Sequence, residues 1–189
     1  RDRAYAALGS TVTIIARSGL LGSMEPFAGE RVAAGLKELG VDVRTDTGTT
    51  SVTRGDDGVS IVLDDGSTVT ATEVLVATGR SPRSGDIGLD VVGLEAGRWI
   101  TVDDTLRVPG SDWLYAVGDV NGRVLLTHQG KYQARAAGDV IAARAKGEDV
   151  DDAPWGKHVA TADSAGAPQV TFSFPEVASV GLTCLLYTS

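Results

Sequence analysis

The stretch Trp113-Leu-Tyr-Ala-Val-Gly-Asp119, followed by Leu125-Leu-Thr-His128, decides the fold of this chain. Its apolar first half predicts a buried strand, and the small residues after His128 predict a helix. A loop between a strand end and a helix start collects unpaired backbone N–H groups at the positive pole of the helix dipole. We therefore expect this loop to bind an anionic or electron-rich ligand, with the Asp119 carboxylate accepting hydrogen bonds from hydroxyl groups.

A second apolar segment ends in a related motif. Glu73-Val-Leu-Val-Ala-Thr-Gly-Arg-Ser-Pro-Arg83 predicts a strand followed by a turn. Its Ala-Thr-Gly-Arg-x-Pro motif, with the later Tyr-Ala-Val-Gly-Asp, strongly resembles the two-dinucleotide flavoproteins. Among these it is most similar to the pyridine nucleotide–disulfide oxidoreductases, which include dihydrolipoamide dehydrogenase, glutathione reductase and mercuric reductase. The resemblance runs from about Ala4 to Thr183.

The order of the predicted elements indicates an α/β fold. Helices and strands alternate at first, as in a doubly wound parallel sheet, and turn signals then predict an antiparallel meander. Helices are expected at Ala4–Leu8, Phe27–Leu39 and Lys131–Ala145, and strands at Thr11–Ala16, Val41–Arg44, Thr50–Arg54, Val59–Leu63, Ser67–Ala71, Glu73–Ala77, Trp99–Val102 and Trp113–Val117.

The resemblance divides the chain into four parts and implies an internal fragment of a flavoprotein. Residues 1–80 are expected to form a partial Rossmann-like NAD(P)-binding domain, without its first strand and Gly-x-Gly-x-x-Gly turn. Residues 81–148 correspond to the second segment of an FAD-binding domain, and residues 149–183, with Pro175-Glu-Val-Ala178, to the start of an α+β dimerisation domain. Residues 184–189 fit no continuation of the family and are interpreted as a non-native tail; a native tail is the alternative.

The resemblance implies FAD as a cofactor at the Gly-Asp motif and at the helix start after it. Asp119, after Gly118, would accept a hydrogen bond from the ribityl chain. The backbone N–H groups of Leu126, Thr127 and His128 would face the pyrimidine edge of the flavin, where negative charge accumulates on reduction. The alternative for this segment is an N-capping Thr127 beside a solvated His128.

The other candidate cofactor residues lie earlier in the chain. Thr78, Gly79 and Arg80 would line the FAD site, because Gly79 permits close backbone approach and Arg80 pairs with either a phosphate or a structural carboxylate. Ala16 and Arg17 follow the strand that ends near the adenosine ribose. NAD-specific enzymes place an acidic residue there, whereas a neighbouring Arg accommodates the 2′-phosphate of NADP. We therefore expect NADP as the cofactor. The alternatives are NAD, and an Arg17 that is merely exposed to solvent.

Composition excludes several classes of protein. The net charge of −8 over 189 residues argues against a nucleic-acid partner, and no apolar run reaches the ~18–20 residues of a membrane span. With no leader pattern visible, we expect a cytoplasmic protein. The single cysteine, Cys184, excludes an internal redox pair, and the two histidines show no metal-binding spacing. We assign no catalytic residue and no metal site within the chain.

The predicted function follows from the resemblance. The parent protein is expected to be a homodimeric, FAD-dependent oxidoreductase that passes hydride from NAD(P)H through the flavin to a disulfide-type or other small-molecule acceptor. Its redox cysteines are expected outside this chain, which by itself would be inactive and would retain FAD weakly. One alternative is an NAD(P)H oxidase or ferredoxin-reductase-like flavoenzyme without redox cysteines. A non-catalytic nucleotide-binding module is the other.

Overall fold

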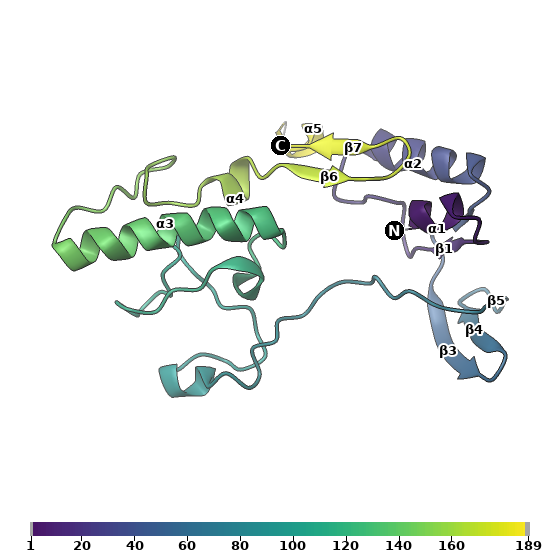
Figure 1. Ribbon diagram of the computed structural model, residues 1–189, viewed down its shortest axis with the longest axis horizontal. Helices are drawn as coiled ribbons and strands as arrows, with labels where there is room; N and C mark the ends of the chain where they lie inside the picture. Colours follow the sequence, from purple (N-terminus) through teal and green to yellow (C-terminus); the bar gives the residue numbers. More distant parts are fainter. Residues whose placement is uncertain (1, 188–189) are drawn as a thin grey trace. The chain divides into compact units, whose positions relative to one another are not determined.

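The computed structural model describes residues 2–187, which form two compact units (Figure 1). The first unit contains the residues up to Ala77 together with those from Gln169 onward, and the second unit contains Thr78–Pro168. The first unit is therefore discontinuous in sequence. Each unit has its own hydrophobic clusters, so each is described by itself.

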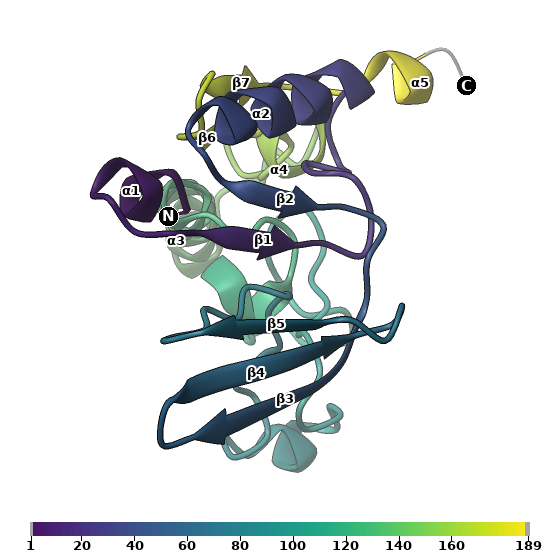
Figure 2. The same cartoon turned by 90° about the vertical axis from the view of Figure 1, so that its right-hand side faces the viewer.

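The first unit begins with the predicted helix–strand–helix–strand pattern. Its elements are helix α1 (Asp2–Ala7), strand β1 (Thr13–Ile15), helix α2 (Pro26–Glu38) and strand β2 (Asp42–Arg44). Strands β1 and β2 are parallel, with Ile14 opposite Val43, and α2 lies against them (Figure 2). Pro26 occupies the first helical turn, where its missing N–H costs nothing. Val32 and Leu36, one turn apart, bury the apolar face of α2.

The predicted antiparallel meander is confirmed as strands β3 (Thr49–Gly55), β4 (Gly58–Leu63) and β5 (Thr68–Ala71). The central strand β4 alternates between half-buried and buried residues, which is the period expected of a strand with one face in a core. Val59, Ile61 and Leu63 form that face, and Ile15 from β1 packs against them. The meander thereby covers part of the small parallel sheet.

A hairpin from the far end of the chain completes the first unit. Strands β6 (Gln169–Thr171) and β7 (Val177–Ser179) are antiparallel, and Val177 joins the cluster around α2. Gly35 permits this docking, since a Cβ at that position would overlap the Phe174 carbonyl oxygen. Two strands therefore lie within the segment that was expected to begin a dimerisation domain, and their packing depends on a glycine of α2.

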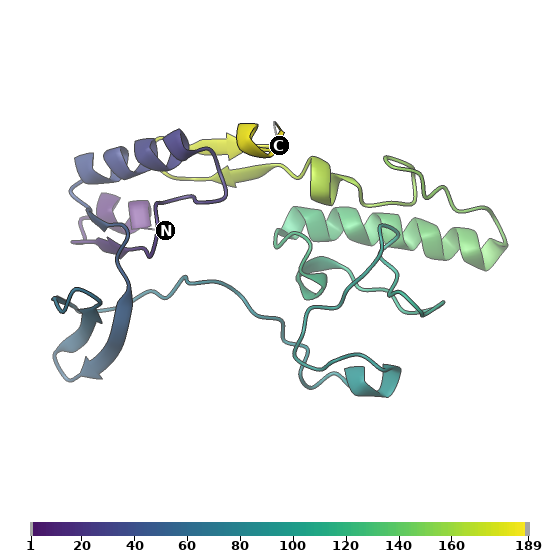
Figure 3. The same cartoon turned by 180° about the vertical axis from the view of Figure 1, so that it is seen from behind.

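The second unit is built around helix α3 (Thr127–Lys146), which is longer than predicted. Its small-residue flank packs closely, with Ala136 and Ala137 buried against Leu106. Gly147 ends the helix in the left-handed conformation at φ 71°. The chain then returns along α3, so that the short helix α4 (Ala162–Ala165) lies beside the N-terminal part of α3 (Figures 1 and 3). Two 3-10 turns, η1 (Leu89–Val92) and η2 (Gly118–Asn121), complete this unit.

Three predicted strands are absent from the part of the chain that the structure describes. Glu73–Ala77 and Trp99–Val102 pair with no strand of residues 2–187, and Val76 is 70% exposed. Trp113–Val117 makes only an isolated antiparallel bridge, between Tyr115 and Arg107. The apolar pattern was wrong about the sheet at these three segments, because a strand needs a neighbouring strand to receive its hydrogen bonds.

The last predicted segment is only partly described. Cys184–Tyr187 form the short helix α5, and residues 188 and 189 lie outside the described residues. The interpretation of residues 184–189 as a non-native tail therefore stays a prediction, as does the four-part domain division. No helix within residues 2–187 combines the length and apolar composition that crossing a membrane requires.

Candidate functional site

The Gly118–Asp119 motif forms a tight turn at the end of an extended segment. Val117 is extended at φ −127° and ψ 152°, and Gly118 then turns into the left-handed region at φ 77°. This conformation favours glycine, because a Cβ would strain the backbone. Asp119 follows on the η2 turn with its side chain 56% exposed. The turn thus presents the Asp119 carboxylate outward, one residue after a backbone position that favours glycine.

The start of α3 lies directly against this turn. A Cβ on Gly130 would be only 3.3 Å from the Gly118 Cα, so two small residues permit the close approach. The helix begins at Thr127 with Leu126 as its N-cap, and no side chain caps it. The alternative of an N-capping Thr127 is therefore wrong, since the extended backbone that defines an N-cap occurs one residue earlier. Among residues 2–187, the N–H groups of Thr127 and His128 have no backbone acceptor and remain available to a ligand, whereas the Leu126 N–H donates to the Val124 carbonyl oxygen at 2.9 Å.

Polar contacts of His128 and Arg80 surround the helix start. His128 Nε2 lies 3.0 Å from the Pro168 carbonyl oxygen. Arg80 Nη1 donates a hydrogen bond to the Leu125 carbonyl oxygen at 2.7 Å and lies 3.6 Å from Asp119 Oδ2. The structure thereby brings together the Thr-Gly-Arg motif and the Gly-Asp motif, which are far apart in sequence.

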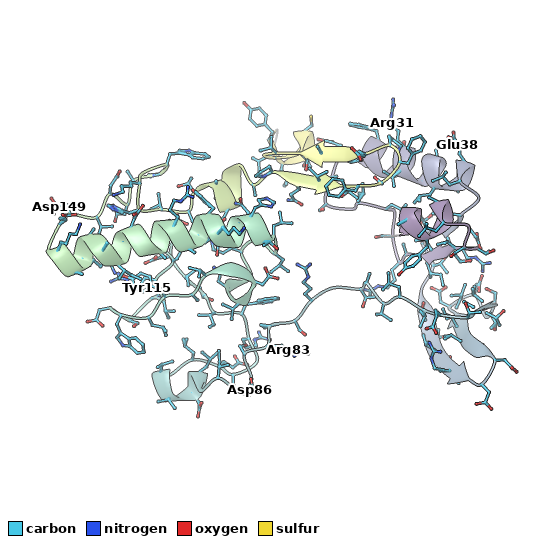
Figure 4. The ribbon with its side chains drawn as sticks, in the orientation of Figure 1. Arg31, Glu38, Arg83, Asp86, Tyr115 and Asp149 are labelled. Atoms are coloured by element: carbon cyan, nitrogen blue, oxygen red, sulfur yellow. The ribbon has the colours of Figure 1, made fainter. Side chains whose placement is uncertain are left out.

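The remaining residues of the Thr78–Arg80 segment lie on the surface. Thr78 and Gly79 are both exposed, and Gly79 has φ 136°, outside the range that other residues adopt easily. A cavity of about 430 Å³ opens beside this segment. Arg83, labelled in Figure 4, belongs to its wall. The cavity is lined by Arg80, Ser81, Pro82, Arg83, Trp99, Asp119 and Val120.

A buried polar network, which the sequence analysis did not predict, supports the Gly118 turn from beneath. Gln133 Oε1 accepts hydrogen bonds from the Gly118 N–H at 2.7 Å and from Asn121 Nδ2 at 2.8 Å. Gln133 Nε2 donates to Asp163 Oδ2 at 2.9 Å, and Arg123 Nε donates to the same oxygen at 3.0 Å. A single carboxylate in the segment after α3 is thus linked to the turn that carries Asp119.

The environment of Asp163 is unusual for a carboxylate. Its side chain is only 1% exposed. Burial raises the pKa of Asp163 above the ordinary value of 3.8, while Arg123, Gln133 and Gln129 act in the opposite direction. The spacing of Gln129 and Gln133, four residues apart on one helix face, is the signal that could have indicated a shared partner. Nothing in the sequence pointed to Asp163 as that partner.

The candidate nucleotide residues Ala16 and Arg17 lie in the first unit, just after β1. Ala16 is half-buried, and its backbone is fully engaged. Its N–H donates to the Arg44 carbonyl oxygen at 2.9 Å, and its carbonyl accepts from the Thr47 N–H at 3.0 Å. Arg17 is exposed, and within residues 2–187 its guanidinium has no ion-pair partner. Its charge is therefore available to an anionic group at the end of β1.

Most of this chain matches one known protein family. The sequence profile of pyridine nucleotide-disulphide oxidoreductases matches residues 3–142. The chain belongs to this family. It is 33% identical over 184 residues to a dihydrolipoyl dehydrogenase of Staphylococcus aureus, covering 94% of this chain and 36% of that protein. It is 34% identical to a mercuric reductase of Streptomyces lividans, covering 95% of this chain and 36% of that protein. The resemblance inferred from the two motifs is thereby confirmed.

Solved structures agree with the family membership and with an α/β fold. LpdA from Mycobacterium tuberculosis superposes with a TM-score of 0.77 at 28% identity, covering 98% of this chain and 38% of that protein. The flavoprotein disulfide reductase RclA from Escherichia coli has the same fold, with a TM-score of 0.77 at 21% identity over 97% of this chain and 39% of that protein. The chain therefore spans little more than a third of the length of these relatives. The predicted fold class, part of a flavoprotein disulfide reductase, is confirmed.

Proposed function

We propose that the whole protein carrying this chain is an FAD-dependent oxidoreductase that passes hydride from NAD(P)H through the flavin to a disulfide-type acceptor. The observation that carries the proposal is the convergence of three family motifs in the second unit. The Gly118–Asp119 turn, the start of α3 and Arg80 lie within direct contact distance of one another. In a member of this family, such a convergence of hydroxyl-binding and anion-binding groups suits a flavin nucleotide.

The chemistry of these residues fits FAD. The Asp119 carboxylate is exposed and, among residues 2–187, faces only Arg80 at 3.6 Å, so its oxygens can accept hydrogen bonds from ribityl hydroxyls. The backbone N–H groups of Thr127 and His128 would face the pyrimidine edge, with Leu126 beside them, whose own N–H donates to the Val124 carbonyl oxygen at 2.9 Å. Thr78–Arg80 would approach the cofactor from the other motif. When bound, the flavin supplies the hydride chemistry, and these residues bind and orient it. A helix N-terminus also stabilises negative charge by about 0.3–2 kcal/mol, which favours a reduced flavin.

We further infer that NADPH is the preferred reductant. Ala16 stands where an acidic side chain would hold the 2′-hydroxyl of NADH, and Arg17, whose guanidinium has no ion-pair partner among residues 2–187, is exposed and can meet a 2′-phosphate. A homodimer, a cytoplasmic location and the division into NAD(P), FAD and dimerisation segments remain part of this proposal. So does the expectation that the chain alone is inactive and retains FAD weakly, which flavin absorbance of the isolated chain tests.

The flavin proposal is tested in the whole protein by Asp119→Ala, with Asp112→Ala as the matched control. Asp112 is also exposed and lies on the same segment. Loss of a hydrogen bond to a charged group costs about 1.5–3 kcal/mol, so we expect the Kd for FAD to rise by about 10–100-fold in Asp119→Ala only. Wild-type protein without bound flavin contradicts the proposal. Turnover with oxygen but with no disulfide would favour the oxidase alternative.

The reductant proposal is tested by Arg17→Glu, with Arg31→Glu on α2 as the control of equal charge change. Both arginines are exposed, and Arg31 is labelled in Figure 4. We expect kcat/KM for NADPH to fall by about 10–100-fold in Arg17→Glu, while the value for NADH changes little, because only NADPH carries the 2′-phosphate. A wild-type protein that uses NADH better than NADPH would overturn this assignment.

A further inference from the structure

Gln133 occupies a fully buried position whose two amide ends meet different partners. Its side chain has no exposed surface, and it lies on α3 under the η2 turn. The amide oxygen accepts from the Gly118 N–H at 2.7 Å and from Asn121 Nδ2 at 2.8 Å. The amide nitrogen donates to Asp163 Oδ2 at 2.9 Å. Since the oxygen faces donors and the nitrogen faces an acceptor, only one orientation of the amide satisfies all three contacts.

Asp163 holds the amide in that orientation and is itself held from several sides. Arg123 Nε donates to Asp163 Oδ2 at 3.0 Å, and Gln129 Nε2 donates to Oδ1 at 3.1 Å. Both carboxylate oxygens are therefore engaged in a place that water barely reaches. An acceptor fixed in this way cannot turn to follow a displaced amide, so it sets the direction of the Gln133 side chain.

The same network reaches the far end of the η2 turn. Asn121 donates from Nδ2 to the Ala116 carbonyl oxygen at 3.0 Å and accepts from the Arg123 N–H at 3.0 Å. Gln133 thus holds the first residue of the Gly118–Asn121 turn, and the side chain of the last residue, Asn121, is tied to Gln133 and to the Ala116 carbonyl oxygen. Asp119, between them, has an exposed side chain, and its one ion-pair partner among residues 2–187 is the equally exposed Arg80. Its position is determined by the backbone on either side.

We propose that Gln133 is a positioning residue for the flavin site, oriented by Asp163 so that its amide oxygen fixes the Gly118 N–H and thereby aims the Asp119 carboxylate. The inference rests on the proposed flavin site and extends it to residues that touch no cofactor. It gives the segment after α3 a role, because Asp163 lies on α4. A carboxylate on this helix would then control how well the ribityl-binding turn is formed.

The variants Gln133→Met and Gln129→Met test the proposal in the whole protein. Both glutamines are buried on α3, both donate to Asp163, and methionine has a similar length, but only Gln133 contacts the Gly118 turn. Two readouts are compared with wild type: the Kd for FAD and the hydrogen-exchange rate of the Gly118 amide. Thermal unfolding of each variant is also recorded, so that its Kd for FAD and its Gly118 exchange rate can be judged against its loss of stability.

We expect Gln133→Met to raise the Kd for FAD by about 10-fold and to accelerate Gly118 exchange by at least about 10-fold, the size of one lost hydrogen bond. Gln129→Met should leave both values within about 3-fold of wild type at a similar loss of stability. Equal effects of the two variants, or no effect of Gln133→Met, overturn the proposal.

Two outcomes separate the failure of the positioning role from the failure of the flavin site. Slow exchange of the half-buried Gly118 amide in the wild-type protein supports the hydrogen bond even where no FAD binds; in that case only the proposed function fails. Exchange of the Gly118 amide at the rate of an unprotected amide overturns the positioning role directly, and this measurement holds even if Gln133→Met does not fold.

Discussion

The pairing of Arg123 with Asp163 offers a quantitative test of how the second unit is held together. The Arg123 side chain is 18% exposed, and the Asp163 side chain is 1% exposed. Arg123→Leu would leave the carboxylate buried without its cation, which costs about 3–5 kcal/mol in a fully buried pair. The amides of Gln129 and Gln133 still donate to it, each worth about 1 kcal/mol. We therefore expect the free energy of unfolding to fall by about 2–4 kcal/mol.

A double-mutant cycle separates this coupling from the loss of packing. In the Asp163→Asn background, Arg123→Leu no longer strands a buried charge, and its cost should be smaller by about 1.5–3 kcal/mol. A matched surface control is Arg98→Leu, whose partner Glu95 lies 3.7 Å away with both side chains largely exposed. That control should change the free energy of unfolding by less than about 1 kcal/mol.

Urea unfolding of the whole protein provides the assay. All three tryptophans of this chain, Trp99, Trp113 and Trp155, lie in the second unit, so the part of the fluorescence change that these tryptophans contribute reports on the unit that contains the pair. Stability is taken from the midpoint and the slope of the transition. Additivity of the two substitutions within about 0.5 kcal/mol would refute the reasoning, because residues that do not interact behave additively.

Two further predictions concern close packing and pH. Gly35→Ala should destabilise the first unit by about 1–3 kcal/mol, because the new Cβ overlaps the Phe174 carbonyl oxygen. The control Gly138→Ala lies on α3 with open space around it, so it should be neutral or stabilising by up to about 1 kcal/mol. Thermal unfolding of both variants measures the difference. Burial raises the pKa of Asp163 in the folded protein above 3.8, the value of the unfolded chain, so the folded protein binds a proton on this carboxyl more readily than the unfolded chain does. The contribution of Asp163 to the free energy of unfolding should therefore fall as the pH rises from about 3.8 through the raised pKa. Urea unfolding at several acidic pH values should show this slope in wild type and not in Asp163→Asn; equal slopes would contradict it.

Much of the local structure was predictable because neighbouring residues determine it. Pro26 starts α2, Gly147 stops α3, and the turns between β3, β4 and β5 occur at glycines that adopt positive φ or allow close pairing. These are limits on backbone conformation that act within a few residues. They hold whatever the rest of the chain does.

The motifs of the candidate site were predictable from the sequence, but the buried residues that hold these motifs in place were not. Gly118, Asp119 and Arg80 were chosen from two short patterns, and the structure places Arg80 and Asp119 3.6 Å apart. Their roles toward FAD remain proposals. Gln133 and Asp163 were missed because the hydrogen bonds that link them to each other and to Gly118 join residues distant in sequence, and no spacing of residue types encodes such a contact.

The sequence by itself determined the family, the C-terminal ends of α2 and α3 to within about a residue, and the meander, since all of these depend on local conformational preference and on motifs read along the chain. Only the tertiary structure decided whether an extended segment became a strand. Trp113–Val117 has the composition of a strand, yet it makes one isolated bridge, because sheet formation requires a partner at the right distance. It also decided which buried polar groups satisfy one another. Burial makes an unpaired donor or acceptor costly, so Asp163, Gln133 and Arg123 gain their partners only when the chain folds back along α3.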